Sequence, residues 1–75
     1  MNSDQSLDCM GLYCPMPIVK TAEKIKGLKS GKVLEVVADD IGIEPDMQAW
    51  CKATGHEYLG LEKEDNELKV YVKKS

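Results

Sequence analysis

Cysteine is the residue type best suited to chemistry in this sequence, and one of the three cysteines stands directly before two prolines. Cys14 is followed by Pro15 and Pro17, and a segment with helical spacing comes next. Proline is tolerated in the first turn of a helix, because the N–H that it lacks would have no partner there. Pro15 also favours the extended geometry of an N-cap at Cys14. We therefore expect Cys14 at or just outside the amino end of a helix.

That position would activate the thiol. The amino end of a helix carries about half a positive charge and unpaired N–H groups, and both favour a thiolate. Cysteines placed there can have a pKa lowered from about 8.5 to between about 3.5 and 7.5. Because Pro15 and Pro17 remove two N–H groups, those of Met16 and Ile18 are left to face the sulfur. The pattern predicts a moderately activated nucleophile.

The sequence around Cys14 resembles the opening signature of the TusA/SirA-like sulfur carrier (sulfurtransferase) family. Residues 7–17 read LDCMGLYCPMP and fit the family pattern L-D-x-x-G-x-x-C-P-x-P. The similarity continues through residues 36–40 (VVADD) and 50–52 (WCK), and the chain has the length of the whole family domain. Two positions depart from the family pattern. The position of Cys9 is commonly not cysteine, and that of Tyr13 is often basic.

The resemblance implies a function. Cys14 as a thiolate would accept sulfur as a persulfide from a protein donor, either a cysteine desulfurase or a rhodanese-like protein, and relay it to a protein acceptor. The acceptors that the family implies act in tRNA thiolation, molybdenum cofactor assembly or sulfur oxidation. This thiol exchange needs no general base, metal or cofactor. If active, the chain would be a transferase.

Composition limits the alternatives. The chain has 75 residues, which is enough for one small domain over residues 1–75 with ragged polar ends at 1–5 and 74–75. The net charge is −3 with ten lysines and no arginine, which argues against direct nucleic-acid binding. Residues 1–6 do not read as a signal peptide, and no segment reads as a membrane span. We expect a cytoplasmic monomer with no membrane partner.

Periodicity predicts the elements that position Cys14. A short apolar strand over residues 7–10 is followed by a helix from 15 or 17 to about 28, then by a valine-rich central strand over 32–38. A second helix runs from 42 or 44 to 54, with Gly55 ending it, and two strands follow at 56–63 and 67–73. The order β-α-β-α-β-β predicts an α+β fold, a two-layer sandwich with a four-stranded mixed sheet and two helices on one face.

The same patterns predict which side chains face the core. Three elements supply the candidates: the first helix through Ile18, Ala22, Ile25 and Leu28; the second helix through Ile43, Met47, Trp50, Cys51 and Thr54; and the last strand through Leu68, Val70 and Val72. Leu59 and Leu61 alternate in the strand before it. Tyr71 is expected to point outward.

The ends of the first two strands should form one edge. If the first crossover is a parallel β-α-β unit, Cys14 and the pair Asp39 and Asp40 lie at the same edge of the sheet. Tyr13 and Met16 flank the cysteine, and a flexible methionine-rich surface suits a thiol that passes between several proteins. We predict one partner-docking surface formed by Tyr13, Met16, Asp39 and Asp40. Met10 and Met16 could instead fill gaps in the core.

Other residues have competing interpretations. Cys9, Cys14, Cys51 and His56 could be read as a zinc site, but the predicted elements do not bring the two pairs together. Cys9 and Cys51 are better explained as packing residues. A dithiol redox protein that uses Cys9 and Cys14 stays open, as does a non-catalytic regulatory module. His56 is expected on the surface, at the edge away from Cys14.

Overall fold

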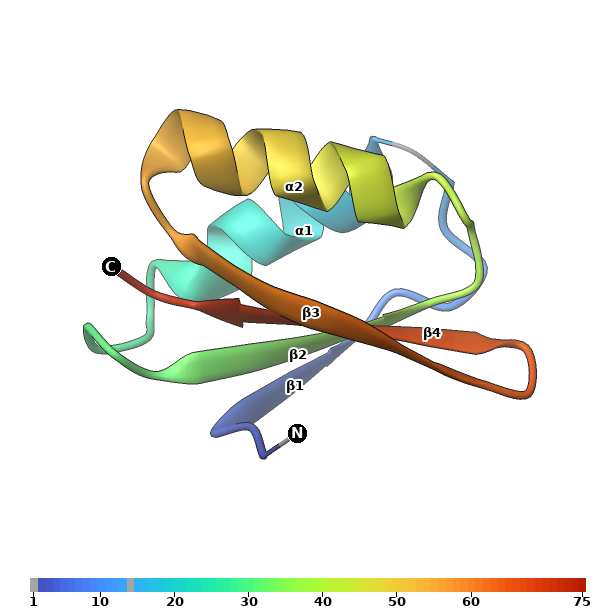
Figure 1. Cartoon of the computed structure of the whole chain (residues 1–75), viewed down its shortest axis with the longest axis horizontal. Coiled ribbons are helices and arrows are strands. Elements are labelled where there is room, and N and C mark those ends of the chain that lie inside the picture. The colour runs from blue at the N-terminus through green and yellow to red at the C-terminus, as the bar shows by residue number, and fades with distance from the viewer. Residues whose placement is uncertain (1, 14) are drawn as a thin grey trace.

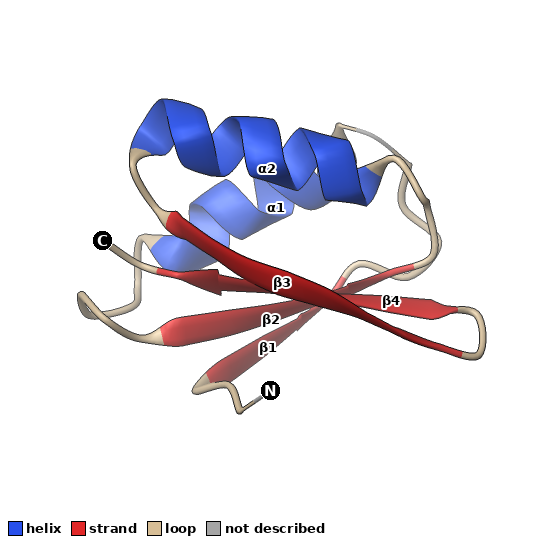
Figure 2. Cartoon of the chain, viewed as in Figure 1, coloured by secondary structure: helices blue, strands red, loops and turns tan. Residues whose placement is uncertain are grey.

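The computed structural model describes residues 2–13 and 15–75 and confirms the predicted order of elements. These are β1 (Gln5–Asp8), α1 (Met16–Ile25), β2 (Val33–Ala38), α2 (Ile43–Thr54), β3 (Glu57–Glu64) and β4 (Glu67–Lys73). Both helices lie on the same face of the sheet (Figures 1 and 2). The fold is therefore the predicted two-layer α+β sandwich.

The strands are arranged in the order β1-β2-β4-β3. β1 pairs with β2 in parallel, with Leu7 opposite Val36, and the other two pairings are antiparallel. β2 is central, as its density of valine and leucine predicted. Because β1 and β2 run in the same direction, the loops that follow them leave from one edge of the sheet, at the right in Figure 1.

β1 lies two residues earlier than predicted. Pairing with β2 continues through the Cys9 N–H, which donates to the Val37 carbonyl over 2.6 Å. The chain then turns, because the Asp8 carboxylate accepts from the Met10 N–H over 2.9 Å and Gly11 takes a φ of 81°. The apolar run at residues 7–10 therefore marks the end of the strand and the turn after it.

Residues near both ends of the chain are hydrogen-bonded to the sheet. The Asp4 N–H donates to the Val33 carbonyl over 2.8 Å, and Gln5 opens β1. The Lys74 N–H donates to the Lys32 carbonyl over 2.9 Å, and its Nζ donates to the Leu28 carbonyl over 2.6 Å. Gln5 and Lys74 are thus more firmly held than the ragged ends predicted for residues 1–5 and 74–75.

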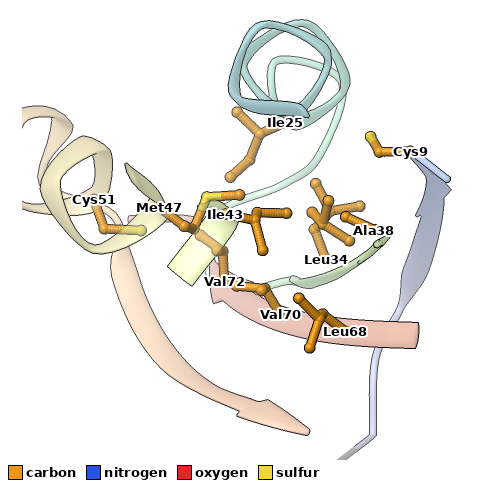
Figure 3. Packing of buried hydrophobic residues seen from close by; sticks show 11 residues of the cluster. Cys9, Ile25, Leu34, Ala38, Ile43, Met47, Cys51, Leu68, Val70 and Val72 are labelled. Atoms are coloured by element: carbon orange, nitrogen blue, oxygen red, sulfur yellow. The ribbon is translucent and has the colours of Figure 1, made fainter. Parts of the chain in front are cut away.

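The core lies between the helices and the two central strands (Figure 3). Its buried members come mainly from β2 (Leu34, Val36 and Ala38), β4 (Leu68, Val70 and Val72) and α2 (Ile43, Met47 and Cys51), with Ile25 from α1 and Cys9 from the loop after β1. The inward positions predicted for β4 are confirmed.

The buried face of α1 is rotated from the predicted one. Pro17, Thr21 and Ile25 are buried, whereas Ile18 and Ala22 are only half-buried. Thr21 can be buried because its hydroxyl donates to the Pro17 carbonyl one turn earlier, over 2.7 Å. Hydrophobic spacing could not show this, since it counts threonine as polar.

α2 ends as the sequence predicted but buries a shorter stripe. Gly55 is left-handed with a φ of 86°, and its N–H donates to the Cys51 carbonyl over 2.8 Å. Trp50 packs against the core while half-buried. Thr54 is exposed, contrary to the prediction, and its hydroxyl donates to the Trp50 carbonyl over 2.8 Å.

β3 contains an irregularity that changes which side chains face inward. Tyr58 lies opposite Val72, but Gly60 lies opposite Tyr71, so the chain contains one extra residue at this point. Tyr58 and Leu61 consequently pack against the core, and Leu59 does not alternate with Leu61 as predicted.

Tyr71 is buried although its side chain is on the face away from the helices. It is only 3% exposed, and its hydroxyl donates to the Glu35 carboxylate over 2.8 Å. The Ser6 hydroxyl donates to the same carboxylate over 2.9 Å. Burial, followed by the bond to Glu35, raises the pKa of Tyr71. Tyr71 therefore points away from the core between the helices and the sheet, as predicted, but its burial on that face was not predicted.

Candidate functional site

Cys14, the predicted reactive residue, lies outside the described residues, but the residues on both sides of it are described. α1 begins at Met16 with Pro15 as its N-cap, so Cys14 directly precedes the N-cap in the sequence. The prediction that a helix begins at the two prolines is confirmed to within one residue. Tyr13 and Pro15, the neighbours of Cys14, are both exposed.

The amide groups at this helix end do not match the sequence prediction. The Met16 N–H donates to the Tyr13 carbonyl over 2.8 Å, and the Ile18 N–H donates to the Pro15 carbonyl over 3.0 Å. These are the two N–H groups that we expected to face the sulfur. Both groups are already bonded to the chain, and the dipole of α1 favours a thiolate at this end.

The loops after β1 and β2 are joined to each other, as the shared-edge prediction requires. The Gly11 N–H donates to the Asp39 carboxylate over 3.2 Å. Asp40 accepts from the Gly42 N–H over 3.0 Å at the start of α2. In Figure 1 the two loops run side by side at the right. Asp39, Asp40 and the loop that leads to Cys14 therefore belong to one edge.

The same end of the molecule carries the exposed large hydrophobic residues of the described chain. They are Met10 (40% exposed), Tyr13 (76%), Met16 (41%), Val19 (43%) and Ile41 (69%). The prediction that Tyr13 is exposed is confirmed, and of the two possibilities left open for Met10 and Met16, exposure rather than core packing holds for both. Sequence reasoning missed Val19 and Ile41. Ile41 stands between Asp40 and Gly42, and that loop context was the signal that favoured its exposure.

Cys9 and Cys51 are packing residues, as predicted. Cys9 is 0% exposed and Cys51 is 3% exposed, and both belong to the core. Burial, together with the negative charge of Asp8, raises the pKa of Cys9, and Lys20 offsets this in part. Burial also raises the pKa of Cys51 to about 11. Both thiols are therefore protonated near neutral pH and poor nucleophiles.

His56 lies at the end of the strands opposite the loops that follow β1 and β2, as expected. It precedes β3, and β3 begins beside Lys73 at the end of β4. Its ring lies against that of Trp50, with centroids 5.1 Å apart, and its Nδ1 accepts from the Ser75 N–H over 3.2 Å.

Within residues 2–13 and 15–75, no three His, Cys, Asp or Glu side chains are grouped so that they could hold a metal ion. No helix in those two ranges is long and apolar enough to cross a membrane.

A small α+β sandwich whose first helix opens on a cysteine–proline motif defines a class of thiol-bearing domains, and comparison with known proteins identifies the family. The chain belongs to the TusA family, since the family described as "Sulfurtransferase TusA" matches residues 5–74.

Individual relatives agree with this assignment. The chain is 46% identical over 74 residues to the putative sulfur carrier protein YrkI of Bacillus subtilis, and the match covers 99% of each of the two chains. It is 54% identical over 68 residues to the putative sulfur carrier protein YrkF of the same organism, covering 91% of this chain but only 37% of YrkF. The chain thus spans well under half the length of that relative. The crystal structure of a SirA-like protein from Desulfitobacterium hafniense shares the fold, with a TM-score of 0.80, 23% identity, and coverage of 92% and 95% of the two chains.

Proposed function

We propose that this protein is a sulfur carrier that accepts sulfur as a persulfide on Cys14 and relays it to another protein. The observation that carries the proposal is that the other two cysteines are buried, whereas the described residues on both sides of Cys14 in the sequence are exposed. Cys9 and Cys51 are buried and have raised pKa values, whereas Tyr13 and Met16, which flank Cys14, are exposed. Family membership and the printed names of the relatives support the same role.

The proposed chemistry consists of two successive thiol exchanges, one that loads sulfur onto Cys14 and one that passes it to an acceptor. The Cys14 thiolate attacks the terminal sulfur of a donor persulfide, R–S–SH. A sulfur–sulfur bond forms to Cys14 as the donor's bond breaks, and the donor leaves as the thiolate R–S⁻. The terminal sulfur keeps its hydrogen, so no net oxidation takes place. In the second exchange an acceptor nucleophile attacks the terminal sulfur, and Cys14 leaves as a thiolate. The rate of each exchange depends on the fraction of the attacking thiol that is ionised and on access to the sulfur.

The partners in this proposal are proteins. A cysteine desulfurase or a rhodanese-like protein would deliver the sulfur, and an acceptor in tRNA thiolation, molybdenum cofactor assembly or sulfur oxidation would receive it. Tyr13, Met16, Asp39 and Asp40 are proposed to contact these partners. We place the relay in the cytoplasm, where thiols stay reduced. The protein would work as a monomer and without a cofactor.

Intact-mass measurement after exposure to a persulfide donor tests the proposal. The reduced protein is incubated with glutathione persulfide, and the modified residue is located by peptide mapping. We expect the gain of one sulfur atom on Cys14, the same gain in Cys9→Ala and Cys51→Ala, and none in Cys14→Ser. An internal disulfide between Cys9 and Cys14 would instead indicate a dithiol redox protein. An unchanged mass would indicate a module whose thiol is incidental.

A further inference from the structure

The fold separates charge along the direction of the strands. The end from which the β1–α1 loop, the β2–α2 loop and the β3–β4 turn project comprises residues 8–20, 38–48 and 62–69. We call it the acidic end, because it holds nine of the thirteen carboxylates and three of the ten lysines, a net charge of −6. The whole chain has a net charge of −3, so the opposite end has a net charge of +3. Figure 1 shows the acidic end at the right.

The acidic end contains a groove beside the loop that follows β2. Asp39, Ile41, Lys63, Asn66 and Leu68 line it. We call it the hairpin groove, since three of these residues come from the β3–β4 hairpin. Leu68 is 4% exposed, whereas Ile41 is 69% exposed and unsupported by the core. An isoleucine this exposed, in a groove that a leucine also lines, offers apolar surface that a partner side chain could cover.

The chemistry around the groove selects the kind of partner. Its apolar residues, Ile41 and Leu68, suit a leucine, isoleucine or methionine side chain. Asp39 lines the groove, and Asp65 follows Glu64 in the turn next to Lys63, whereas Glu64 itself is paired with Lys69 over 3.1 Å. Beside the groove, the two carboxylates of Asp39 and Asp65 therefore exceed the one ammonium group of Lys63. A partner residue next to the inserted side chain would therefore be lysine or arginine. Complementary charge of this kind steers a partner and sets its orientation.

We propose that the hairpin groove binds a basic segment of a protein partner, with one large apolar side chain of that segment inserted between Ile41 and Leu68. The inference rests on the proposed function, because it gives the sulfur-exchanging partner a second contact beyond the residues that flank Cys14. The partner's segment lies across the β2–α2 loop, and this orients the reacting sulfur of the partner toward the β1–α1 loop. A protein whose docking surface is acidic would be repelled.

Titration of the protein with short peptides, followed by nuclear magnetic resonance, tests the groove without any sulfur chemistry. The probe is acetyl-Lys-Leu-Lys-Lys-amide. Its controls are the acidic peptide acetyl-Glu-Leu-Glu-Glu-amide and the serine peptide acetyl-Lys-Ser-Lys-Lys-amide. We expect saturable shifts of the Ile41, Asn66 and Leu68 amides with the probe, weaker shifts with the serine peptide, and none with the acidic peptide. Equal shifts with both leucine peptides, shifts centred on the lysine-rich end, or no shifts at all would overturn the proposal.

Paired variants separate the apolar and the charged contributions. Ile41→Ser should weaken probe binding by about tenfold, while Val19→Ser, which changes an exposed apolar residue outside the groove, should leave it unchanged. Asp65→Asn should reduce the salt dependence of binding. Glu57→Gln makes the same change in net charge at the other end and should not. Loading of Cys14 by glutathione persulfide should be equal in all four proteins, so failure of the groove and failure of the carrier function remain distinguishable.

Discussion

The Gly11 amide donates to the Asp39 carboxylate over 3.2 Å, and this bond joins the loop that leads to Cys14 to the loop that leads into α2. The bond links residues 28 positions apart in the sequence. Gly11 can offer its N–H in this direction because its φ is 81°, a conformation that costs glycine little. Asp39 therefore has a structural role besides the partner contact that we propose for it.

Substitutions at Asp39 should separate its bond from its charge. Asp39→Ala removes the acceptor and should lower the free energy of unfolding by about 1 kcal/mol. Asp39→Asn keeps an acceptor oxygen and should recover most of that loss. Hydrogen exchange of the Gly11 amide, measured with urea unfolding, checks both. Equal protection of Gly11 in the alanine and asparagine variants would show that the bond does not hold the loop.

The charge of the β2–α2 loop can be tested with both of its turn bonds preserved. Asp39→Asn with Asp40→Asn keeps acceptor oxygens for the Gly11 and Gly42 amides. The double variant should load sulfur more slowly from a basic protein donor, and the rate should depend less on ionic strength. Loading from glutathione persulfide serves as the control for intrinsic thiol reactivity. An unaltered salt dependence with the protein donor would contradict an electrostatic docking role.

The two prolines at the start of α1 should have different roles. Pro17 is fully buried, so Pro17→Ala should lower the free energy of unfolding by about 1–2 kcal/mol through lost packing and a less restricted unfolded chain. Pro15 is exposed and restricts the backbone of Cys14, so Pro15→Ala should mainly slow sulfur loading. Urea unfolding and loading rates, measured on both variants, check this. The opposite pattern, with Pro15→Ala the less stable variant, would refute the assignment.

Cys51 should make the protein less stable at alkaline pH. The folded state holds the Cys51 proton up to a pKa of about 11, whereas the unfolded chain releases it near 9.0. Its contribution is thus complete below about pH 9 and is lost as the pH rises toward 11, for a total of about 2–3 kcal/mol. In Cys51→Ala the loss of stability over this range should be correspondingly smaller. Urea midpoints between pH 6 and 11 test this, and below pH 8 the difference between the two proteins should be constant.

Much of the fold could be predicted because strong local signals agreed with one another. Gly55 ended α2 where expected, and β4 followed a regular alternation of Leu68, Val70 and Val72. The errors arose where a side-chain hydrogen bond allowed a polar group to be buried. Thr21 can be buried because its hydroxyl donates to a carbonyl of the same helix, and Tyr71 can be buried because its hydroxyl donates to the Glu35 carboxylate on the neighbouring strand β2. Neither partner can be identified from periodicity.

The meeting of the two loops was predicted, but their hydrogen bonds were not. The parallel pairing of β1 and β2 brought Asp39 to the loop before Cys14, as the topology implied. The bonding of the Met16 and Ile18 amides could not be foreseen, because it depends on how the carbonyls of Tyr13 and Pro15 are turned. The exposure of Ile41 could have been predicted, because this branched apolar residue stands between Asp40 and Gly42, which indicates a loop.

The irregularity in β3 has a consequence for how other proteins can approach. β3 is one edge of the sheet, and its extra residue and Gly60, with a φ of 153°, interrupt the row of backbone groups that another strand would need. β1, at the other edge, is only four residues long. Neither edge is suited to extending the sheet into a neighbouring chain. Partners must therefore recognise this protein through its side chains and loops, so a few surface substitutions could redirect it from one partner to another.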